Sequence, residues 1–562
     1  MDEDDSDGAP PARAQVLVAG GGPCGLMLAN ELGRRGVTVA VVDEKPGTAV
    51  NPQANATQAR TMEHYRRLGF ADEVRALGLP SDYPTDVGYF TRYAGHELAR
   101  FALPAARDAK AARQDGYVSA PEPPHRISQK FVEPVLRRHA AALPGISLHY
   151  GWRLANFTQD AHGVRGEVER VSDGRRAVIA ADYLMGADGA RSPVRHALDI
   201  RHQGEARAVR HLMGGRMYAV YLRAPDFYAV TGMAKAWMHV TFNHDRRAFM
   251  MAVDGKGEFA FHTQLRPGED ENEIDDARAV ALFQAAVGAP VAAEVITRAP
   301  WNAGYSLVAE RFGQGRVFLG GDAAHLFTPA GGLGYNTAVE DAVNLGWKLA
   351  AVLKGRAAPA LLESYEAERR PLAQRNTAYA KGFADGLGLL EAPPELEDDT
   401  PQGEAARAAA GRYFDTHARK EFDIPGVTFG GRYDGSPAIV ADGTAAPPDA
   451  ANLYVPTACP GGRAPHLWLD DGASLYDRFG FEWTLMRMGT APADGMISAA
   501  RARGLDLTVL DVLEARPLYE ADLALIRPDQ IVAWRGDAED ADVWAQILDG
   551  RPPTAGAAAQ PA

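Results

Sequence analysis

Runs of apolar residues divide the beginning of the chain into two predicted strands and a helix. Residues 14–20 (AQVLVAG) and 37–42 (VTVAVV) are short and continuously apolar, which is typical of buried parallel strands. A helix is expected between them from about Pro23, and Gly36 is placed to end it. This βαβ unit predicts a doubly wound parallel sheet at the start of the chain, in an α/β fold.

Residues 317–353 continue this pattern as a buried strand, an acidic turn and a long helix. The turn is Gly320-Gly321-Asp322, and a glycine-rich crossing separates it from the helix. Residues 183–186 (YLMG) resemble another central strand. Apolar residues recur along the helix at spacings of four and three, which predicts one inner face against the sheet, made of Ala338, Ala342, Leu345, Leu349 and Val352.

The rest of the chain predicts further units. Residues 204–300 contain many short alternating segments, which favour an antiparallel sheet inserted into the first domain. Residues 391–429 begin with an acidic, alanine-rich stretch of low hydrophobicity and are expected to be a linker or surface excursion. The predicted boundaries are 14–80, 125–203 and 301–390 for the discontinuous first domain, 81–124 and 204–300 for the second, 391–429 for the linker and 430–550 for a third, with a disordered lead-in at 1–13 and a flexible tail at 551–562.

Composition and charge narrow the classes of function. A chain of 562 residues is too long for one core, and 46% hydrophobic with 23% charged residues is ordinary for a globular protein. The formal net charge of −14 disfavours nucleic acid and anionic membranes as partners, and we find no run of about 20 apolar residues that predicts a membrane span. The acidic N-terminus lacks the apolar core of a signal peptide. Cys24 and Cys459 form neither a CxxC nor a metal-type cluster, so we expect a cytoplasmic protein without disulfides or a metal.

A glycine motif, Gly20-x-Gly22-x-x-Gly25, follows the first strand and opens the helix. The first glycine permits a tight turn, the second lets backbone approach a pyrophosphate, and the third allows close packing of helix and strand. Asp43, with Glu44 beside it, follows the second strand, where an acid can bind a ribose hydroxyl. The glycines alone would also fit an ordinary turn. With both strands, the helix and the acid, they predict a dinucleotide site in a Rossmann-like domain.

Two further motifs lie at strand ends. Residues 186–195 pass through an Asp-Gly turn at Asp188 into a new helix, and Asp322 of the later turn can accept hydrogen bonds from a sugar-like chain. Each motif alone would also fit a helix cap. Pro329 and the glycines at 331, 332 and 334 let backbone approach a flat, partly anionic object, toward which the helix N-terminus presents free N–H groups. We interpret that object as a flavin ring.

Together and in this order, the three motifs resemble the class A flavoprotein hydroxylases of the p-hydroxybenzoate hydroxylase fold. The resemblance implies that the first motif binds the ADP part of FAD, that the Asp188 motif lies near the FAD and NAD(P)H paths, and that Asp322 binds the ribitol. Residues 125–136 (HRISQKFVEPVL) are similar to the family's segment whose glutamine lies beside the flavin. Where many members have Pro-Arg-Ala this chain has Pro52-Gln53-Ala54, so the resemblance implies no charge contact there. The predicted cofactor-binding residues are Gly20, Gly22, Pro23, Gly25, Asp43, Glu44, Gln129, Asp188, Arg191, Asp322, Pro329, Gly332, Gly334, Tyr335 and Asn336.

Within that family the chain looks most similar to the three-domain phenol hydroxylases, notably the 2,4-dichlorophenol 6-monooxygenase type. Residues 454–480 and 525–535 carry this similarity. It implies a thioredoxin-like last domain without the redox cysteine pair, in agreement with the lack of a CxxC. We expect that domain to have a structural role or to form the contact of a homodimer.

The resemblance also implies the chemistry. NAD(P)H would dock transiently and reduce the flavin, dioxygen would add to give a flavin hydroperoxide, and its distal oxygen would attack an electron-rich ring. A phenol is activated by losing its proton, so a polar residue is expected near its hydroxyl. The candidates are Asn55, Tyr218, Tyr221 and His239, with Pro329 on the flavin loop, although tyrosine and histidine on such a sheet are more often packing residues. Trp237, Phe249 and Met251 fit a cavity wall or core equally, and His325 is expected to be structural, with a satisfied ring.

The sequence therefore predicts an FAD-dependent, NAD(P)H-consuming monooxygenase that hydroxylates a small phenolic compound. A tailoring hydroxylase of larger aromatic polyketides is the alternative within the family. A flavoprotein reductase without productive use of oxygen, and a flavin-binding protein without turnover, are alternatives of other classes. Stimulation of NAD(P)H oxidation by phenols and formation of an oxygenated product distinguish these hypotheses.

Overall fold

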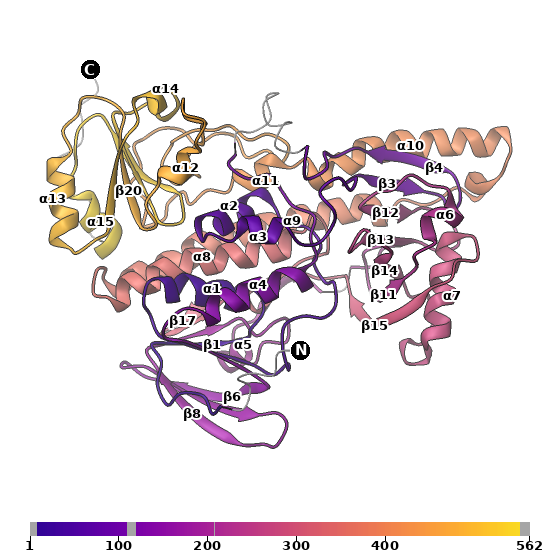
Figure 1. The fold of residues 1–562 in the computed structure, drawn as a ribbon, viewed down its shortest axis with the longest axis horizontal. Helices are drawn as coiled ribbons and strands as arrows, with labels where there is room; N and C mark the ends of the chain where they lie inside the picture. Colours follow the sequence, from indigo (N-terminus) through magenta and orange to yellow (C-terminus); the bar gives the residue numbers. More distant parts are fainter. Residues whose placement is uncertain (1–7, 109–119, 207, 551–562) are drawn as a thin grey trace.

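The computed structural model describes residues 8–108, 120–206 and 208–550, so most of the predicted lead-in and the whole predicted tail lie outside the described residues. Figure 1 shows a parallel sheet with its helices in the middle of the molecule, a large mostly antiparallel sheet at one end and the C-terminal part of the chain at the other. Helices α8 (Leu333–Leu353) and α9 (Glu363–Gly388) cross the middle and link these parts.

The central sheet has six strands in the order β17-β18-β9-β1-β2-β5, all parallel except the edge strand β17. Helices α1 (Pro23–Arg34), α4 (Gln129–Ala141) and α8 lie together on one side of it (Figure 1). A small antiparallel sheet, β6-β7-β8, lies at the other side, where a second helical layer would complete a doubly wound fold. The strands are β1 (Val16–Ala19), β2 (Val39–Asp43), β5 (Ile146–Tyr150), β6 (Trp152–Gln159), β7 (Val164–Arg170), β8 (Arg176–Ala181), β9 (Tyr183–Gly186), β17 (Gly313–Gln314) and β18 (Val317–Leu319).

The large sheet has seven strands in the order β15-β11-β14-β13-β12-β3-β4. Its strand pairs are antiparallel except β12 with β3, which are parallel. This pair joins the two separate chain segments, 81–124 and 204–300, that were expected to form the second domain. Helices α6 (Phe227–Thr231) and α7 (Asp276–Val287) cover one face. The strands are β3 (Val87–Phe90), β4 (Glu97–Phe101), β11 (Arg216–Arg223), β12 (Met238–Thr241), β13 (Ala248–Ala252), β14 (Glu258–Gln264) and β15 (Glu294–Asn302).

The region expected to be a linker is helical instead. Helix α10 (Pro401–Phe422) begins with Thr400 as its cap and packs along the edge of the large sheet (Figure 1). Phe414 stacks on Tyr89 of β3 at 4.5 Å and meets Phe242 edge-on at 4.9 Å. Its few apolar residues recur on one side of the helix (Ala410, Phe414, Ala418), so a low average hydrophobicity conceals a buried stripe.

The C-terminal part contains a four-stranded sheet in the order β21-β20-β22-β23, in which only β20 and β21 are parallel. Helix α13 (Asp494–Ala502) connects the two parallel strands, and α15 (Val543–Asp549) follows the last strand, which is the thioredoxin-like order. The strands are β20 (Trp483–Arg487), β21 (Leu507–Asp511), β22 (Leu523–Ile526) and β23 (Val532–Gly536). Trp483 meets Trp347 of α8 edge-on at 5.6 Å, so this sheet packs directly on the helix.

A buried ionic cluster fixes the C-terminal part to the two long helices. Arg527 donates to both carboxylate oxygens of Glu368, at 2.7 and 2.9 Å. Lys348 donates to Glu368 at 2.6 Å, and all three side chains are fully buried. Burial alone would raise the pKa of Glu368, but Arg527 and Lys348 hold that pKa far below its usual range.

We predict that Arg527→Met destabilises the protein by about 3–5 kcal/mol, because it leaves a buried carboxylate without its main partner. Arg487→Met is the matched control, since Arg487 pairs with Asp511 at the surface, where such pairs contribute about 0–1 kcal/mol. Urea unfolding measures both. Because the pKa of Glu368 is depressed in the folded state, the difference between wild type and Arg527→Met should be present at neutral pH and shrink under acid conditions. Equal losses for the two variants would contradict this role.

Candidate cofactor and substrate site

The first glycine motif is shaped by close packing at two of its glycines and is open at the third. Gly20 has φ +109°, and a Cβ there would lie 2.1 Å from the carbonyl oxygen of Ala187 in the second motif. A Cβ at Gly25 would lie 2.0 Å from the carbonyl oxygen of Gly20. A Cβ at Gly22 would meet no described atom within 4 Å. Gly20 and Gly25 therefore join strand, helix and second motif, while Gly22 faces the space in which a pyrophosphate would fit.

Helix α1 starts in this turn with its N-terminus free. Gly22 is the N-cap and Pro23 the first helical residue, and within the described chain no side chain caps the helix and no acid lies in its first turn. Asp43 accepts the N–H of Gly21 at 2.7 Å and that of Lys45 at 2.8 Å, so it also shapes the turn, while Glu44 is exposed beside it. The result is a ready site for an anion.

The second motif contacts the third through an arginine to which the sequence assigned no role. Asp188 accepts the N–H of Val194 at 3.0 Å and so fixes the start of α5 (Pro193–Ala197), and Arg191 is exposed. The buried Arg195 donates to the carbonyl oxygen of Ala323 at 3.1 Å, directly after Asp322. A buried guanidinium needs acceptors, and here they are main-chain oxygens that no sequence spacing reveals.

Asp322 stands out by its exposure. Every other residue from 317 to 326 is buried, whereas the side chain of Asp322 is exposed at the end of strand β18. A carboxylate presented to solvent by an otherwise buried stretch has the geometry to accept hydrogen bonds from a polyhydroxylated chain.

The turn that carries Asp322 is held by the buried Asp341 of α8. Asp341 accepts the N–H of Gly321 at 3.1 Å, lies 2.7 Å from Nε2 of His325 and accepts from Arg369 at 2.8 Å. Burial would raise the pKa of Asp341, but His325 and Arg369 hold it below its usual value. The expectation for His325 is met at Nε2 only, because its buried Nδ1 has no partner among the described residues.

The glycine crossing before α8 adopts a conformation that favours glycine. Gly331 and Gly332 have φ +63° and +64°, and a Cβ at Gly332 would lie 2.9 Å from the Cβ of Ala56. Gly332 is the N-cap of the 21-residue α8, which has no side-chain cap and no acid in its first turn within the described chain. Pro329 and Gly334 are half-buried on either side. We call residues 329–334 the flavin loop.

Three predicted cofactor ligands have side-chain hydrogen bonds within the protein, and those of Asn336 and Tyr335 reach the segment opposite this loop. Asn336 accepts from the N–H of Gln58 (2.8 Å) and from Thr61 (2.6 Å), and donates to the carbonyl oxygens of Ala56 (3.0 Å) and Gly332 (2.6 Å). Its amide is therefore fully used within the protein. The hydroxyl of Tyr335 bonds to that of Tyr65, and Gln129 donates to Glu133.

Strand register assigns two faces to the large sheet. Directly paired residues share a face, so Met251, Ala260 and Tyr221 lie in one row and Phe249, His262 and Ala219 in the next. The alternate residues Met250, Phe261 and Val220 point the other way, and Phe261 contacts Phe283 of α7 at 5.5 Å. We call the first face the cleft face and the second the core face. Residual exposure is 4–9% for Phe249, Tyr221, Met251 and His262, against 0–1% for the core-face residues.

The prediction that His239 is catalytic is wrong, because His239 lies on the core face. It is 0% exposed, is surrounded by aromatic rings that include Phe227 of α6, and lies 3.2 Å from the hydroxyl of Tyr228. Burial lowers the pKa of His239 to about 3, so the ring is neutral at physiological pH. Tyr218 lies on the same face, with its hydroxyl bonded to the carbonyl oxygen of Ile274 at 3.3 Å.

Tyr221 and Asn55 remain candidates. Tyr221 lies on the cleft face, where its hydroxyl bonds to Lys130 of α4 and to Glu258. Asn55 is 7% exposed and donates to the carbonyl oxygen of Pro52 at 3.2 Å. Its buried Oδ1 meets no donor in the part of the chain that the structure describes. A buried, unsatisfied acceptor beside the flavin loop is available to a substrate hydroxyl.

The cleft face adds two residues that the sequence did not single out. His262 stacks on Phe249 with 4.7 Å between ring centroids and meets Trp301 edge-on at 5.5 Å. Burial lowers the pKa of His262 to about 4, and neither its Nδ1 nor the indole N–H of Trp301 has a partner within the described residues. The alternation of side chains along a strand predicts two faces of the sheet, but it does not show which face lines the cavity.

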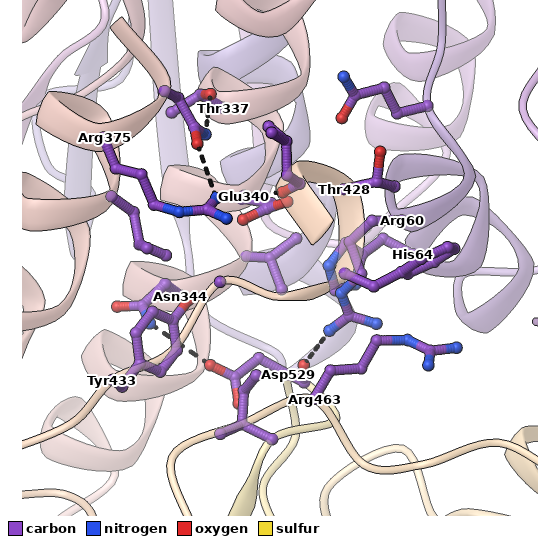
Figure 2. Close-up of a pocket in the computed structure, with 18 residues that line it drawn as sticks. Arg60, His64, Thr337, Glu340, Asn344, Arg375, Thr428, Tyr433, Arg463 and Asp529 are labelled. Atoms are coloured by element: carbon purple, nitrogen blue, oxygen red, sulfur yellow. Dashed lines mark hydrogen bonds between the residues drawn. The ribbon is translucent and has the colours of Figure 1, made fainter. Parts of the chain in front are cut away.

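A polar pocket between α2 (Ala59–Arg67), α8 and the C-terminal part is separate from this site (Figure 2). Arg60 and Asp529 meet at its wall, where Arg60 donates to the main-chain oxygen of Asp529. Its free volume of about 30 Å³ corresponds to roughly one water molecule, too small for an aromatic ring. Among the described residues we find no cluster of metal ligands, and none of their helices is long and apolar enough to cross a membrane.

The fold and the site thus define a flavoprotein: an anion site at α1, a carboxylate for a polyhydroxylated chain, and a glycine loop at the start of a second uncapped helix, set against an aromatic sheet face. Residues 13–380 match the family described as "FAD binding domain" and residues 457–550 match "Aromatic-ring hydroxylase, C-terminal". The chain belongs to the family of FAD-dependent aromatic-ring hydroxylases, and FAD is its cofactor.

Relatives and solved structures cover almost the whole chain. The FAD-dependent monooxygenase apdD of Emericella nidulans is 31% identical over 94% of this chain and 89% of its own length. Phenol 2-monooxygenase of a Pseudomonas species is 30% identical over 95% of this chain and 92% of its own length. Aklavinone 12-hydroxylase RdmE of Streptomyces purpurascens is 32% identical over 95% of this chain and 97% of its own length. The rebeccamycin biosynthetic enzyme RebC with bound 7-carboxy-K252c has a TM-score of 0.85 at 33% identity (96% and 99%). The flavin-dependent monooxygenase PieE with FAD and substrate has a TM-score of 0.85 at 30% identity (96% and 100%).

We predict that Asp322→Ala weakens FAD binding by about tenfold or more, because a hydrogen bond to a charged group contributes about 1.5–3 kcal/mol. The measurement is flavin content after purification, followed by titration of the apoprotein with FAD. Asp506→Ala, at an exposed position in the C-terminal part, is the control and should retain wild-type affinity. Full flavin occupancy in Asp322→Ala would count against a ribitol contact.

Proposed function

We propose that this protein is an NAD(P)H-dependent monooxygenase that hydroxylates a phenolic aromatic ring. The observation that carries the proposal is the meeting of the flavin loop with the cleft face. Ala56, which lies next to Gly332, and Leu333 belong to the apolar cluster of the large sheet, which includes Phe249, Met251 and Tyr221 of the cleft face as well as residues of the core face. An aromatic ring held there lies between the cofactor loop and a wall of aromatic and sulfur-containing side chains.

The chain's own residues supply orientation, charge and exclusion of water. Bound FAD supplies hydride acceptance from a nicotinamide cofactor and activation of dioxygen. The free N-terminus of α8 at Gly332 stabilises negative charge beside it. Phe249 and Met251 exclude water, and Oδ1 of Asn55 offers an acceptor for the proton of a phenolic hydroxyl.

A second candidate is the hydroxylation of a larger, polycyclic aromatic compound. The names of several relatives favour it, among them aklavinone 12-hydroxylase and two putative polyketide hydroxylases of Streptomyces. The cleft face supports it too, because its aromatic residues extend across the sheet from β13 through β14 to Trp301 on β15. Phenol and polycyclic substrates share the same chemistry and differ in how much of this face they cover.

We expect NADPH or NADH oxidation by the FAD-loaded protein to increase at least about tenfold with a fitting hydroxylated aromatic compound. The increase reflects catalysis only if one hydroxylated product forms for each nicotinamide consumed. Simple phenols, naphthols and hydroxyanthraquinones should be compared, with oxygen uptake and product mass as readouts. If NADPH or NADH is oxidised but hydrogen peroxide is the sole product with every compound, the result would instead support the reductase alternative.

We further predict that Asn55→Ala raises KM for the hydroxylated substrate by about five- to tenfold, the effect of losing one hydrogen bond at a buried acceptor. FAD content should be unchanged, since among the described residues the side-chain amide of Asn55 donates to Pro52 of its own loop. Asn272→Ala, at an exposed turn before α7, is the control. An unchanged KM in Asn55→Ala would remove this residue from the substrate site.

A further inference from the structure

Arg126 is a buried cation without an acceptor. It lies three positions before Gln129, where the chain enters α4, and is 8% exposed. Its guanidinium packs against the rings of Trp237 and Phe422, at 4.4 and 4.3 Å from their centroids, and these two rings meet each other edge-on. No oxygen of the residues 8–108, 120–206 and 208–550 accepts a hydrogen bond from it.

This arrangement is costly without a ligand. A guanidinium has five N–H donors, and burial without acceptors removes much of the water that would otherwise bond to them. Burial lowers the pKa of Arg126 to about 10, which still leaves it charged at neutral pH. The two rings attract the cation but supply no hydrogen-bond acceptor. By contrast, the buried Arg369 and Arg527 both bond to buried carboxylates.

Two neighbouring polar groups are also incompletely paired. Glu421, at the end of α10, accepts the N–H of Gly331 at 3.2 Å with one oxygen, and its other oxygen has no partner among the described residues. Burial raises the pKa of Glu421 to about 7, so near neutral pH it is partly protonated and then a donor itself. The buried hydroxyl of Tyr89 has no partner in the described chain either. Arg126 influences Glu421 electrostatically, but no salt bridge joins them within the described chain.

The position of Arg126 connects it to the substrate side of the site. His125, directly before Arg126, exchanges main-chain hydrogen bonds with Thr57, so Arg126 belongs to a segment that runs beside Asn55 and Ala56. Glu421 contacts Gly331 of the flavin loop. Arg126 therefore lies at the corner between the flavin loop and the start of strand β12 of the large sheet. Lys130, one helical turn further along the chain, is paired with Tyr221 of the cleft face and with Glu258.

We propose that Arg126 binds a carboxylate carried by the aromatic substrate, with the hydroxyl of Tyr89 as a second donor. The proposal rests on the proposed function and narrows it to aromatic acids. The carboxylate supplies the acceptors that the guanidinium lacks, in a two-point geometry that arginine favours. The rings of Trp237 and Phe422 pack against the guanidinium and restrict its orientation. The aromatic ring of the substrate then extends from this corner along the cleft face.

The test is isothermal titration calorimetry of the FAD-loaded protein with pairs of probes that differ only in charge. The pairs are benzoate and benzamide, 2-naphthoate and 2-naphthamide, and anthracene-2-carboxylate and its carboxamide. For the ring size that fits, we expect the carboxylate to bind at least about tenfold more tightly than the amide. In Arg126→Met this preference should fall below about twofold, and in the matched variant Lys130→Met it should persist. Equal binding of acids and amides, no binding of any acid, or an unchanged preference in Arg126→Met would overturn the proposal.

Thermal unfolding without ligand separates this role from a structural one. Removing an unpaired buried charge should leave the Tm of Arg126→Met unchanged or raise it, whereas the loss of a stabilising partner of Glu421 would lower it by several degrees. A lowered Tm counts against the proposal. Because neither measurement involves nicotinamide or turnover, selective acid binding without hydroxylation would contradict the proposed function alone. Hydroxylation of neutral phenols without acid binding would contradict this inference alone.

Discussion

Asp341 is fully buried in helix α8, and a carboxylate in such a place must be paired on all sides. Its partners are the N–H of Gly321, the ring of His325 and the guanidinium of Arg369, which belong to the cofactor turn, the strand after it and helix α9. These bonds set the distance between the end of strand β18 and the start of α8. The exposure of Asp322 and the path of the flavin loop both depend on that distance. A catalytic site that must hold a cofactor within a fraction of an ångström is thus supported by a fully buried ionic contact.

The elements that hold the cofactor could be predicted because their signals are local. A glycine turn between a strand and a helix, followed by an acid at the end of the next strand, has few alternative structures. Asp341 could not be predicted in this way. It occupies the buried side of a helix among Ala338, Ala342 and Leu345, and its partners come from two other segments, the turn that contains Gly321 and His325 and helix α9. The bonds of Asn336 to Gln58, Thr61 and Ala56 could not be predicted for the same reason, because they join segments far apart in the sequence.

The substrate side was harder to predict, and His239 shows why. Alternation along a strand separates two faces, and a shift of one residue exchanges them, but nothing local states which face meets a cavity. His239 and Phe249 lie on neighbouring strands, and only the register of the sheet and the position of α6 place one in the core and the other in the cleft. The composition of helix α10 did not predict that it packs on the large sheet, because alanine and charged residues dominate a helix whose buried side is only a narrow stripe. It supplies Glu421 and Phe422 to the surroundings of Arg126, so the expectation of a linker or surface excursion gave no hint of these contacts.

The ionic cluster of Glu368, Lys348 and Arg527 has a consequence for the modular appearance of the chain. The C-terminal part has its own sheet and helices and would be expected to separate easily from the rest. Its arginine, however, is the counter-ion of a carboxylate in α9, and its tryptophan Trp483 covers Trp347 of α8. A shorter fragment ending before this part would expose an apolar helix side and leave Glu368 without its bidentate partner. Gene truncation or limited proteolysis is therefore a poor route to an isolated flavin-binding unit.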